Sequence, residues 1–198
     1  MTTALVTTKP GQLKQAFHNR GLSHYYPELP DYITYNEAHA ILDAATPNIR
    51  DYLLLSILWN TGLRISEALS LTLNDVRDSS IRVKGKRGKI RIVPIKDQVL
   101  NNLYPYAIEK KIQYQDRLFP ISRSHAHRLL NKYAKAAGIH RPLHCHLLRH
   151  GFAVNFLRQV HNIVYLQELL GHSSIETTRI YTRAALPDVR AALEQVEM

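Results

Sequence analysis

The segment spanning residues 146–183, HLLRHGFAVNFLRQVHNIVYLQELLGHSSIETTRIYTR, places chemically reactive side chains among apolar residues at helical spacing. His146, Arg149 and His150 stand at i, i+3 and i+4, so a helix presents all three on one face. An imidazole beside a guanidinium forms a site for an oxyanion or a phosphate. A second helix and the turn HSS follow, and then comes Tyr181. We therefore interpret this tyrosine as a nucleophile toward a phosphodiester.

The charge of the chain favours a polyanionic partner. Lysine and arginine number 26 against 16 acidic residues, which gives a net charge of +10 and a pI near 9.8. Nucleic acid is the first expectation and an anionic membrane surface the second. Six cations also fall within ten residues that contain no acid, at Arg82, Lys84, Lys86, Arg87, Lys89 and Arg91. A solvated edge would show the same pattern, but a polyanion would neutralise it.

Length and composition narrow the class of protein. A chain of 198 residues with 45% apolar content can bury a core in one large domain, or in one domain with short arms. The longest apolar run is interrupted by Ser56 and Asn60, so we expect no membrane span. The N-terminus has no continuous apolar segment of a secretion signal. A single cysteine, Cys145, excludes an internal disulfide and fits a reducing cytoplasm.

The first half of the chain predicts two helices followed by a hairpin. Thr34 and Glu37 have capping-box spacing, which predicts a helix that Pro47 ends. The run IRDYLLLSILWNTG is apolar on most faces, as expected of a buried central helix stopped at Gly62. Two β-prone runs, SIRV and KIRIVPI, are joined by KGKRGK, and Pro94 lies near the end of the second.

The second half is expected to be helical. Residues 97–115 have a helical pattern that Pro105 interrupts or restarts, and SHAHRLLNKYAKAAG predicts an amphipathic helix with a serine start. Further helices are expected over 146–158 and 162–170, with a short one carrying Tyr181. The fold class is therefore α+β, a mainly α-helical domain with a small antiparallel β-sheet or hairpin.

Four boxes carry a more specific signal. TGLRISEALSL, VKGKRGKIRIVPI, HLLRHGFA and LLGHSSIETTRIYT occur in this order between residues 61 and 182. They resemble the signature boxes of the tyrosine recombinase, or phage-type integrase, catalytic domain, whose DNA breaking-rejoining fold is shared with type IB topoisomerases. The resemblance covers roughly residues 34–183.

This resemblance implies a role for each matched residue. The catalytic set would be Arg64, Lys86, His146, Arg149, His172 and Tyr181. The two arginines would clamp the phosphate, Tyr181 would attack it, and Lys86 would protonate the leaving oxygen. Glu67 would support the site by holding His146 or Arg64. We expect His150 to be a buried, hydrogen-bonded supporting residue, and we assign DNA binding to Arg82, Lys84, Arg87, Lys89 and Arg91.

The implied activity is that of a site-specific DNA recombinase. Such an enzyme cuts and rejoins double-stranded DNA through a 3′-phosphotyrosine intermediate, without a cofactor or a metal, to integrate, invert or resolve DNA segments. Family members work as a homo-tetramer on paired sites. A relaxing enzyme of the type IB class and a DNA-binding regulatory relative are the alternatives. The regulator would be expected to lose Arg64, Arg149 or Tyr181, and all three are present.

The resemblance also suggests how the chain is organised. We expect residues 1–30 to form an N-terminal arm in place of a full core-binding domain, and residues 31–183 to form the catalytic domain. Either this short arm suffices to clamp DNA, or the chain acts with a helper DNA-binding protein, or it is a fragment. Residues 184–198 have the spacing of an amphipathic helix, either packed on its own domain or exchanged between protomers.

Each assignment has a simpler alternative. Tyr181 is one of eleven tyrosines, and a tyrosine on an amphipathic helix is usually a core or boundary residue. Arg64 could cap the preceding helix, and Lys84 or Lys89 could take the role of Lys86. The histidines near Cys145 could suggest zinc, but their spacing does not match a metalloprotease helix and there is no second cysteine.

Overall fold

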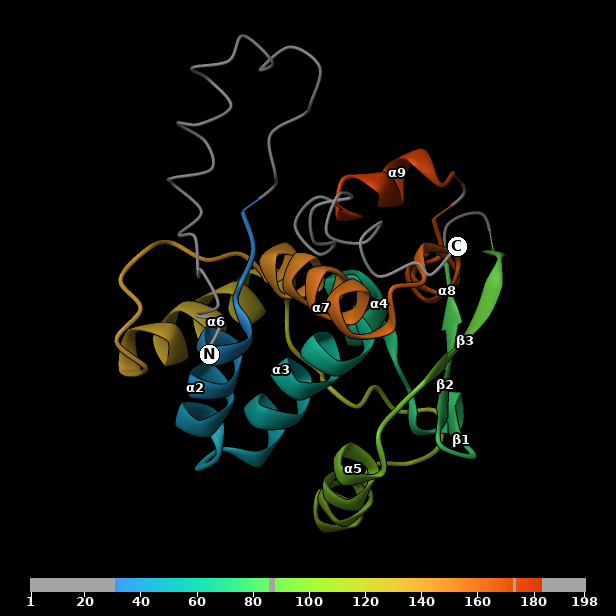
Figure 1. Ribbon diagram of the computed structural model, residues 1–198. Helices are drawn as coiled ribbons and strands as arrows, with labels where there is room; N and C mark the ends of the chain where they lie inside the picture. Colours follow the sequence, from blue (N-terminus) through green and yellow to red (C-terminus); the bar gives the residue numbers. More distant parts are fainter. Residues whose placement is uncertain (1–30, 86–87, 173, 183–198) are drawn as a thin grey trace, which may run out of the picture.

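The computed structural model describes residues 31–85, 88–172 and 174–182. The expected arm and tail lie outside these residues, as do Lys86 and Arg87. The described part is mainly helical, with one small sheet beside the helices (Figure 1).

The elements follow one another in this order: α2 (Tyr35–Ala45), α3 (Ile49–Thr61), α4 (Ile65–Ser70), the 3-10 helix η2 (Leu73–Asp75), β1 (Val76–Arg77), β2 (Ser80–Lys84), β3 (Ile90–Pro94), α5 (Asp97–Glu109), α6 (Arg123–Ala136), α7 (Cys145–Val160), α8 (Ile163–Leu170) and α9 (Glu176–Arg179). Together they confirm the predicted fold class.

The predicted ends of the first two helices are confirmed. Thr34 caps α2, where the Glu37 backbone N–H donates to Thr34 Oγ1 at 3.3 Å and the Glu37 carboxylate accepts from the Thr34 N–H at 2.8 Å. Gly62 ends α3 in the left-handed conformation, at φ 63°, which glycine adopts without steric cost. This turn sets the direction in which the chain leaves α3 toward Arg64.

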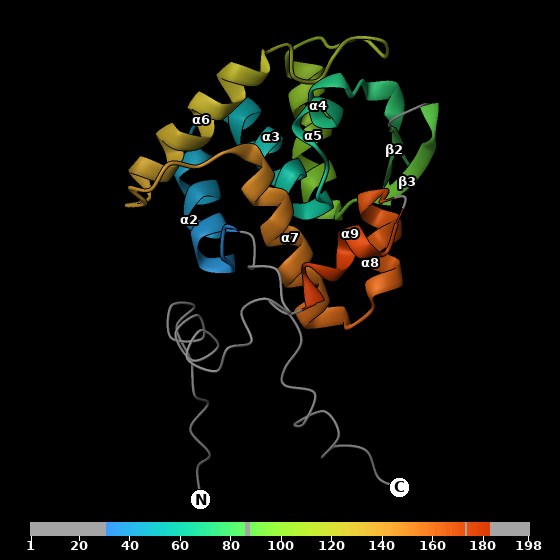
Figure 2. The ribbon, with the colours of Figure 1, turned by 90° about the horizontal axis from the view of Figure 1, so that it is seen from above.

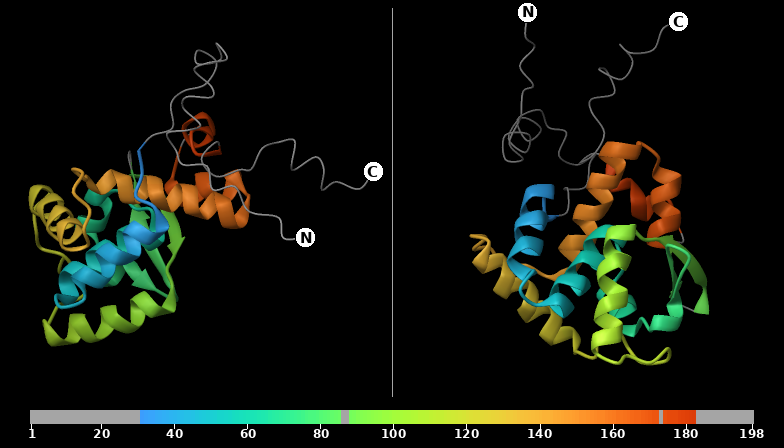
Figure 3. Two further views of the ribbon diagram at one scale, coloured as in Figure 1. Left: turned by 60° about the vertical axis from the view of Figure 1, so that its left-hand side comes forward. Right: turned by 90° about the horizontal axis from the view of Figure 1, so that it is seen from below.

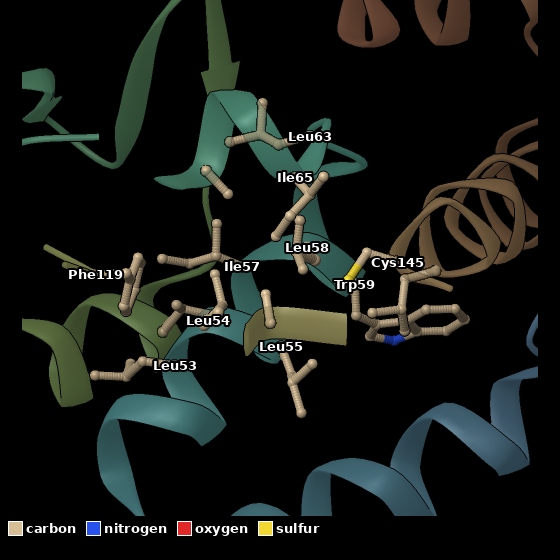
Figure 4. Close-up of a cluster of buried hydrophobic side chains, with 14 of the residues drawn as sticks. Leu53, Leu54, Leu55, Ile57, Leu58, Trp59, Leu63, Ile65, Phe119 and Cys145 are labelled. Carbon is tan, nitrogen blue, oxygen red and sulfur yellow. The ribbon is translucent and has the colours of Figure 1, made fainter. Parts of the chain in front are cut away.

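Helix α3 forms the centre of the main core. Nine of its thirteen residues are buried, as expected of a helix that is apolar on most faces. Leu54, Ile57 and Leu58 lie among side chains from several other elements, including Phe119 and Cys145 (Figure 4). Helices α5 and α7 lie on opposite sides of α3 (Figures 1 and 3). The packing therefore fixes α7, the helix that carries His146, Arg149 and His150.

The sheet contains three antiparallel strands in the order β1-β2-β3, so the predicted hairpin has a short additional strand. Arg82 is paired with Ile92 and Lys84 with Ile90, and these four side chains lie on the exposed face. Strand β3 packs against α8 (Figure 2). The sheet therefore lies beside the C-terminal helices, which carry several of the predicted site residues.

A second apolar cluster joins α7, α8 and the segment after α9. Its buried members are Ala153, Val154, Leu157, Leu166, Leu170 and Tyr181. The predicted nucleophile is thus held in a small core of its own, separate from the one around α3.

Two sequence predictions need correction. Pro105 lies inside α5, which runs without a break to Glu109 and ends before residue 115. Proline has no N–H, so the carbonyl of Asn101, four residues earlier, loses its helical hydrogen bond. Because Asn101 is exposed, water can bond to this carbonyl instead, and the helix continues. The serine that caps α6 is Ser122, which accepts from the His125 N–H at 3.1 Å, and not Ser124.

In the described part of the chain, no helix combines the length and apolar character needed to cross a membrane.

The close packing of α7 against Ile33 and Trp59 can be tested at Gly151. A methyl group on its Cα would lie closer than van der Waals contact to the carbonyl oxygen of Ile33 and to the ring of Trp59. Glycine to alanine in an ordinary helix interior stabilises by about 1 kcal/mol. Here we expect Gly151→Ala to lower the free energy of unfolding by about 1–3 kcal/mol, because no space is left between α7 and Ile33 for the added methyl group.

Urea titration of the wild-type and Gly151→Ala proteins measures the difference in their free energies of unfolding. Gln159→Ala, on the exposed side of the same helix, is the control and should change the free energy by no more than about 0.5 kcal/mol. A stabilised Gly151→Ala protein would contradict the close approach of α7 to Ile33.

Candidate active site

Arg149 lies at the centre of the predicted site. Its side chain is 1% exposed, and its guanidinium donates to the carbonyl of Gly62 at 2.7 Å and to that of Leu170 at 2.8 Å. These carbonyls belong to the C-terminal ends of α3 and α8, where unpaired acceptors and the helix dipole favour a cation. Burial, followed by the charge of Arg64, lowers the pKa of Arg149 to about 10. The group stays cationic at neutral pH.

Arg64 is the N-cap residue of α4 and therefore follows, rather than caps, the α3 terminus. Its Nη1 donates to Glu67 Oε1 at 3.0 Å, and its backbone N–H donates to Glu67 Oε2 at 2.8 Å. The side chain is 40% exposed, so the guanidinium is accessible to solvent. Because the charge of Arg64 lowers the pKa of Arg149, the two predicted clamp residues lie within electrostatic reach of each other.

Glu67 holds Arg64, which was one of its two expected partners. Burial alone would raise the pKa of Glu67, but its hydrogen bonds with Arg91 and with the Arg64 N–H outweigh that effect and lower it. The carboxylate therefore remains charged at neutral pH. A buried anion between two cations fixes both guanidinium groups in place.

Arg91 is the main correction to the predicted site. Nη1 and Nη2 bind the two oxygens of Glu67, each at 3.0 Å, and Nε donates to the Leu169 carbonyl at 2.9 Å. The side chain is 14% exposed. A guanidinium engaged in these internal bonds braces β3 against α4 and α8, which favours a structural role for Arg91 over the predicted DNA binding. Strand alternation could have shown this, since Arg91 shares the inward face with Val93.

His172 lies directly against Arg149. Its Nε2 is 3.0 Å from Arg149 Nη2, and its Nδ1 is 2.9 Å from the hydroxyl of Thr178. The C-cap Gly171, at φ 63°, turns the chain so that the histidine points back at the site. Burial, followed by the charge of Arg149, lowers the pKa of His172 to about 4. Sequence reasoning did not identify Thr178, because a threonine in TTRIY carries no signal of burial.

Tyr181 lies just beyond α9, rather than within it, and is 2% exposed. Its hydroxyl is 2.7 Å from Nδ1 of His150, the residue expected to be buried and hydrogen-bonded. Burial raises the pKa of Tyr181, and the charges of Arg149 and Arg64 oppose part of that rise. Burial also lowers the pKa of His150 to about 4. A neutral imidazole and an un-ionised phenol thus share this hydrogen bond.

The remaining predicted residues lie around this centre. The ring of His146 is exposed and stands edge-on to that of His150, with centroids 4.4 Å apart. Arg82, Lys84 and Lys89 are exposed on the sheet, although Arg82 also forms an ion pair of 3.2 Å with Asp75. The structure places no part of Lys86, so its predicted role is untested.

Helix α6 presents a second basic surface, which sequence analysis missed. Arg123, Arg128, Lys132 and Lys135 are all exposed on it. The charge of Arg123 contributes to lowering the pKa of His146, so the start of α6 lies near the site. The signal was available in the sequence, since no acidic residue occurs between Asp116 and Glu168.

The histidines form no metal-binding cluster in the described ranges. No group of three or more histidine, cysteine or acidic side chains there is close enough to hold an ion. Arg149, Arg64 and His146 instead suit an anion, because their side chains can carry positive charge or donate hydrogen bonds.

The buried histidines predict a dependence of stability on pH. The pKa of both His150 and His172 is about 4 in the folded protein, against 6.5 ordinarily. Between these values the unfolded chain binds protons that the folded chain does not. We therefore expect full stability above pH 6.5 and a progressive loss as the pH falls toward 4, measured by urea unfolding.

His150→Asn should make this slope shallower. His161→Asn is the control, because His161 is exposed at the left-handed end of α7, a conformation that asparagine tolerates. It should leave the slope unchanged. Equal slopes in wild type and His150→Asn would contradict the burial of a neutral imidazole.

Known proteins share this fold and sequence. The Phage integrase family model matches residues 31–186. A tyrosine recombinase of Pseudothermotoga lettingae is 38% identical over 160 residues, which cover 77% of this chain and 56% of that protein. The chain spans about 60% of the length of the curated relatives it matches.

Two solved structures are similar. The XerH site-specific recombinase bound to difH substrate in a pre-cleavage complex superposes with a TM-score of 0.74 and 28% identity, covering 85% of this chain and 54% of that one. The catalytic domain of bacteriophage HP1 integrase gives 0.66 and 30%, covering 85% and 95%. With a family match over most of its length, this chain belongs to the phage integrase family of tyrosine recombinases.

Proposed function

We propose that this protein is a site-specific recombinase that cuts and rejoins double-stranded DNA through a 3′-phosphotyrosine intermediate. The observation that carries the proposal is the environment of Arg149. Within the described residues its guanidinium bonds two carbonyls and one imidazole, and no carboxylate. Buried charges are normally paired, so a cation held in this way, beside Arg64, favours an incoming anion.

A DNA phosphate would complete this arrangement. Arg64, Arg149 and His146 would stabilise the negative charge that grows on the non-bridging oxygens during cleavage, and His172 would hold the Arg149 guanidinium in place. The catalytic power would come from positioning and fixed charge, so that neither a metal ion nor ATP is needed. Glu67 would keep Arg64 oriented through the 3.0 Å ion pair.

Tyr181 would supply the attacking oxygen. The phenol proton would pass to the His150 imidazole, whose Nδ1 lies 2.7 Å from Oη. A bond would form between Oη and phosphorus while the bond from phosphorus to the 5′ oxygen breaks, leaving a 3′-phosphotyrosine and a 5′-hydroxyl. Lys86 would give its proton to the departing oxygen. The released hydroxyl of a partner duplex would then attack the phosphotyrosine and restore a phosphodiester.

Exposed cations would hold the duplex across the site. Lys84 and Lys89 on the sheet and Arg123 and Arg128 on α6 are all exposed. Their contacts with phosphates would position the DNA without reading its sequence. Binding should weaken steeply with salt, because each contact releases counterions.

The wider assembly is part of the proposal. Residues 31–183 would be the catalytic domain, in keeping with the 95% coverage of the HP1 integrase catalytic domain. Residues 184–198 would be exchanged between protomers of a tetramer on paired sites, and a helper DNA-binding protein would assist the arm at 1–30. A DNA substrate would place the protein in the cytoplasm.

Tyr181→Phe tests the nucleophile. The probe is a pool of nicked duplexes with randomised centres, from which covalent protein–DNA adducts are recovered under denaturing conditions and sequenced. We expect wild type to yield adducts mapped to Tyr181, and Tyr181→Phe to yield none while it still binds DNA in a gel-shift assay. Tyr165→Phe, at a tyrosine that is 57% exposed, is the matched control and should react normally. An adduct that persists in Tyr181→Phe would place the nucleophile elsewhere.

Lys86→Ala tests the general acid. On a recovered duplex we expect cleavage about 10²-fold slower than wild type or more, since general acids contribute about 10²–10⁴-fold. A 5′-bridging sulfur hardly needs protonation, so the same variant should cut the phosphorothiolate duplex at a rate close to that of wild type.

Lys89→Ala is the matched control, because Lys89 is an exposed neighbour in the same basic turn. Loss of its phosphate contact should weaken binding to both duplexes alike, so the ratio of the two cleavage rates should match that of wild type. A defect in Lys86→Ala that sulfur does not rescue would remove Lys86 from this role.

A further inference from the structure

Thr178 connects His172 with the segment that carries Tyr181. The residue lies in α9 and is 0% exposed, whereas its neighbour Thr177 is exposed. Its hydroxyl is 2.9 Å from Nδ1 of His172, and its carbonyl accepts the backbone N–H of Tyr181 at 3.0 Å. One buried threonine therefore touches both the imidazole and the backbone of the predicted nucleophile.

The bond between His172 and Arg149 shows where the imidazole proton lies. A guanidinium can only donate, so the Nε2 atom that lies 3.0 Å from Arg149 must present its lone pair. A neutral imidazole then carries its proton on Nδ1, which donates to Thr178 Oγ1. The low pKa of His172, about 4, agrees with a neutral ring at pH 7.

Arg149 cannot easily turn away to release this constraint. Its other donors are bound to the carbonyls of Gly62 and Leu170, at 2.7 and 2.8 Å. Rotating the imidazole is also restricted, because Nε2 faces the Arg149 guanidinium and Nδ1 faces the Thr178 hydroxyl. Arg149 therefore sets the tautomer of His172, and Thr178 Oγ1 is the acceptor that holds the Nδ1 proton in place.

We propose that Thr178 is a positioning residue, which accepts a hydrogen bond from Nδ1 of His172, holds the imidazole against Arg149 and thereby makes the geometry around Arg149 depend on the placement of Tyr181. The inference rests on the proposed function for its consequence in catalysis. Thr178 and Tyr181 are separated by a single helical turn, so they enter or leave the site together. When the segment is displaced, His172 loses its Nδ1 partner and the phosphate site loses its order.

This coupling would keep the reaction from starting on an incomplete site. A phosphate bound while α9 is displaced would meet an imidazole whose ring is no longer held at Nδ1. The same phosphate bound with α9 in place would meet Arg149 and His172 in a single arrangement, next to the phenol. Residues that orient a functional histidine through its second nitrogen typically contribute about 10–100-fold to activity or affinity.

Thr178→Val removes the hydroxyl while retaining similar bulk, and Thr178→Ser retains the hydroxyl. Thr177→Val is the matched control on the exposed side of the same helix. Long-range ¹H–¹⁵N spectra of the full chain without DNA, at pH 7, distinguish protonated from unprotonated ring nitrogens. The signals of His172 are assigned by their loss in His172→Asn.

We expect His172 to be protonated on Nδ1 alone in wild type, in Thr178→Ser and in Thr177→Val, and to lose this single form in Thr178→Val. Cleavage of a recovered nicked duplex should be about 10–100-fold slower in Thr178→Val. It should stay within a few-fold of wild type in the other two variants. DNA binding by gel shift should change little in any of them.

A wild-type spectrum with His172 protonated on Nε2 would overturn the tautomer assignment, whether or not the valine variant folds. Equal spectra and equal cleavage rates in Thr178→Val and wild type would overturn the coupling. The spectra need no DNA, so failure of the proposed function appears separately, as the absence of any Tyr181 adduct in wild type.

Discussion

The guanidinium of Arg149 ties together the ends of two helices that come from distant parts of the chain. The carbonyls of Gly62 and Leu170 close α3 and α8, and neither helix supplies a donor of its own for them. A single buried cation satisfies both and lies in the favourable field of both helix termini. The site therefore depends on the same contact that holds α7, α3 and α8 together, and removal of Arg149 would disturb the fold as well as the chemistry.

Charge compensation around Arg149 is indirect. Glu67, the acid that lies nearest in this network, is bound to Arg64 and Arg91 and is 7% exposed. Its negative charge stabilises the cationic form of Arg149 across space, without a direct bond. Two guanidinium groups are thus held by one carboxylate, while a third is left to carbonyls and an imidazole. That imbalance is the physical basis for an anion site, and it requires α4, β3 and α8 to be in place together.

Features that depend on local sequence were predictable. Thr34 with Glu37, Gly62 at the end of α3, and the common helical face of His146, Arg149 and His150 follow from spacing and backbone preference. Their side chains are close in the chain, so a short window contains all the information. The roles of Arg64, His172 and Tyr181 were predicted from the resemblance of the four boxes to a known family, and not from local physical preferences.

Contacts between distant segments were not predictable in this way. Arg91 was read as a cation for DNA because the run of basic residues hid its inward register, and only the packing of β3 against α8 brings Leu169 within its reach. Thr178 has no feature that separates it from Thr177 until α9 is folded onto His172. Pro105 failed as a helix breaker because solvent near Asn101 can replace the lost hydrogen bond.

The burial of Tyr181 has a further consequence for a cell that holds this protein. A phenol that is 2% exposed and bonded to His150 cannot touch a phosphate on a passing duplex unless that bond breaks and the ring turns toward Arg149. Under the proposed function, copies that are not engaged on a target site would keep their reactive oxygen covered, and chance encounters with the chromosome would leave no nicks. Strand breakage would then be confined to complexes stable enough to turn the tyrosine toward the bound phosphate.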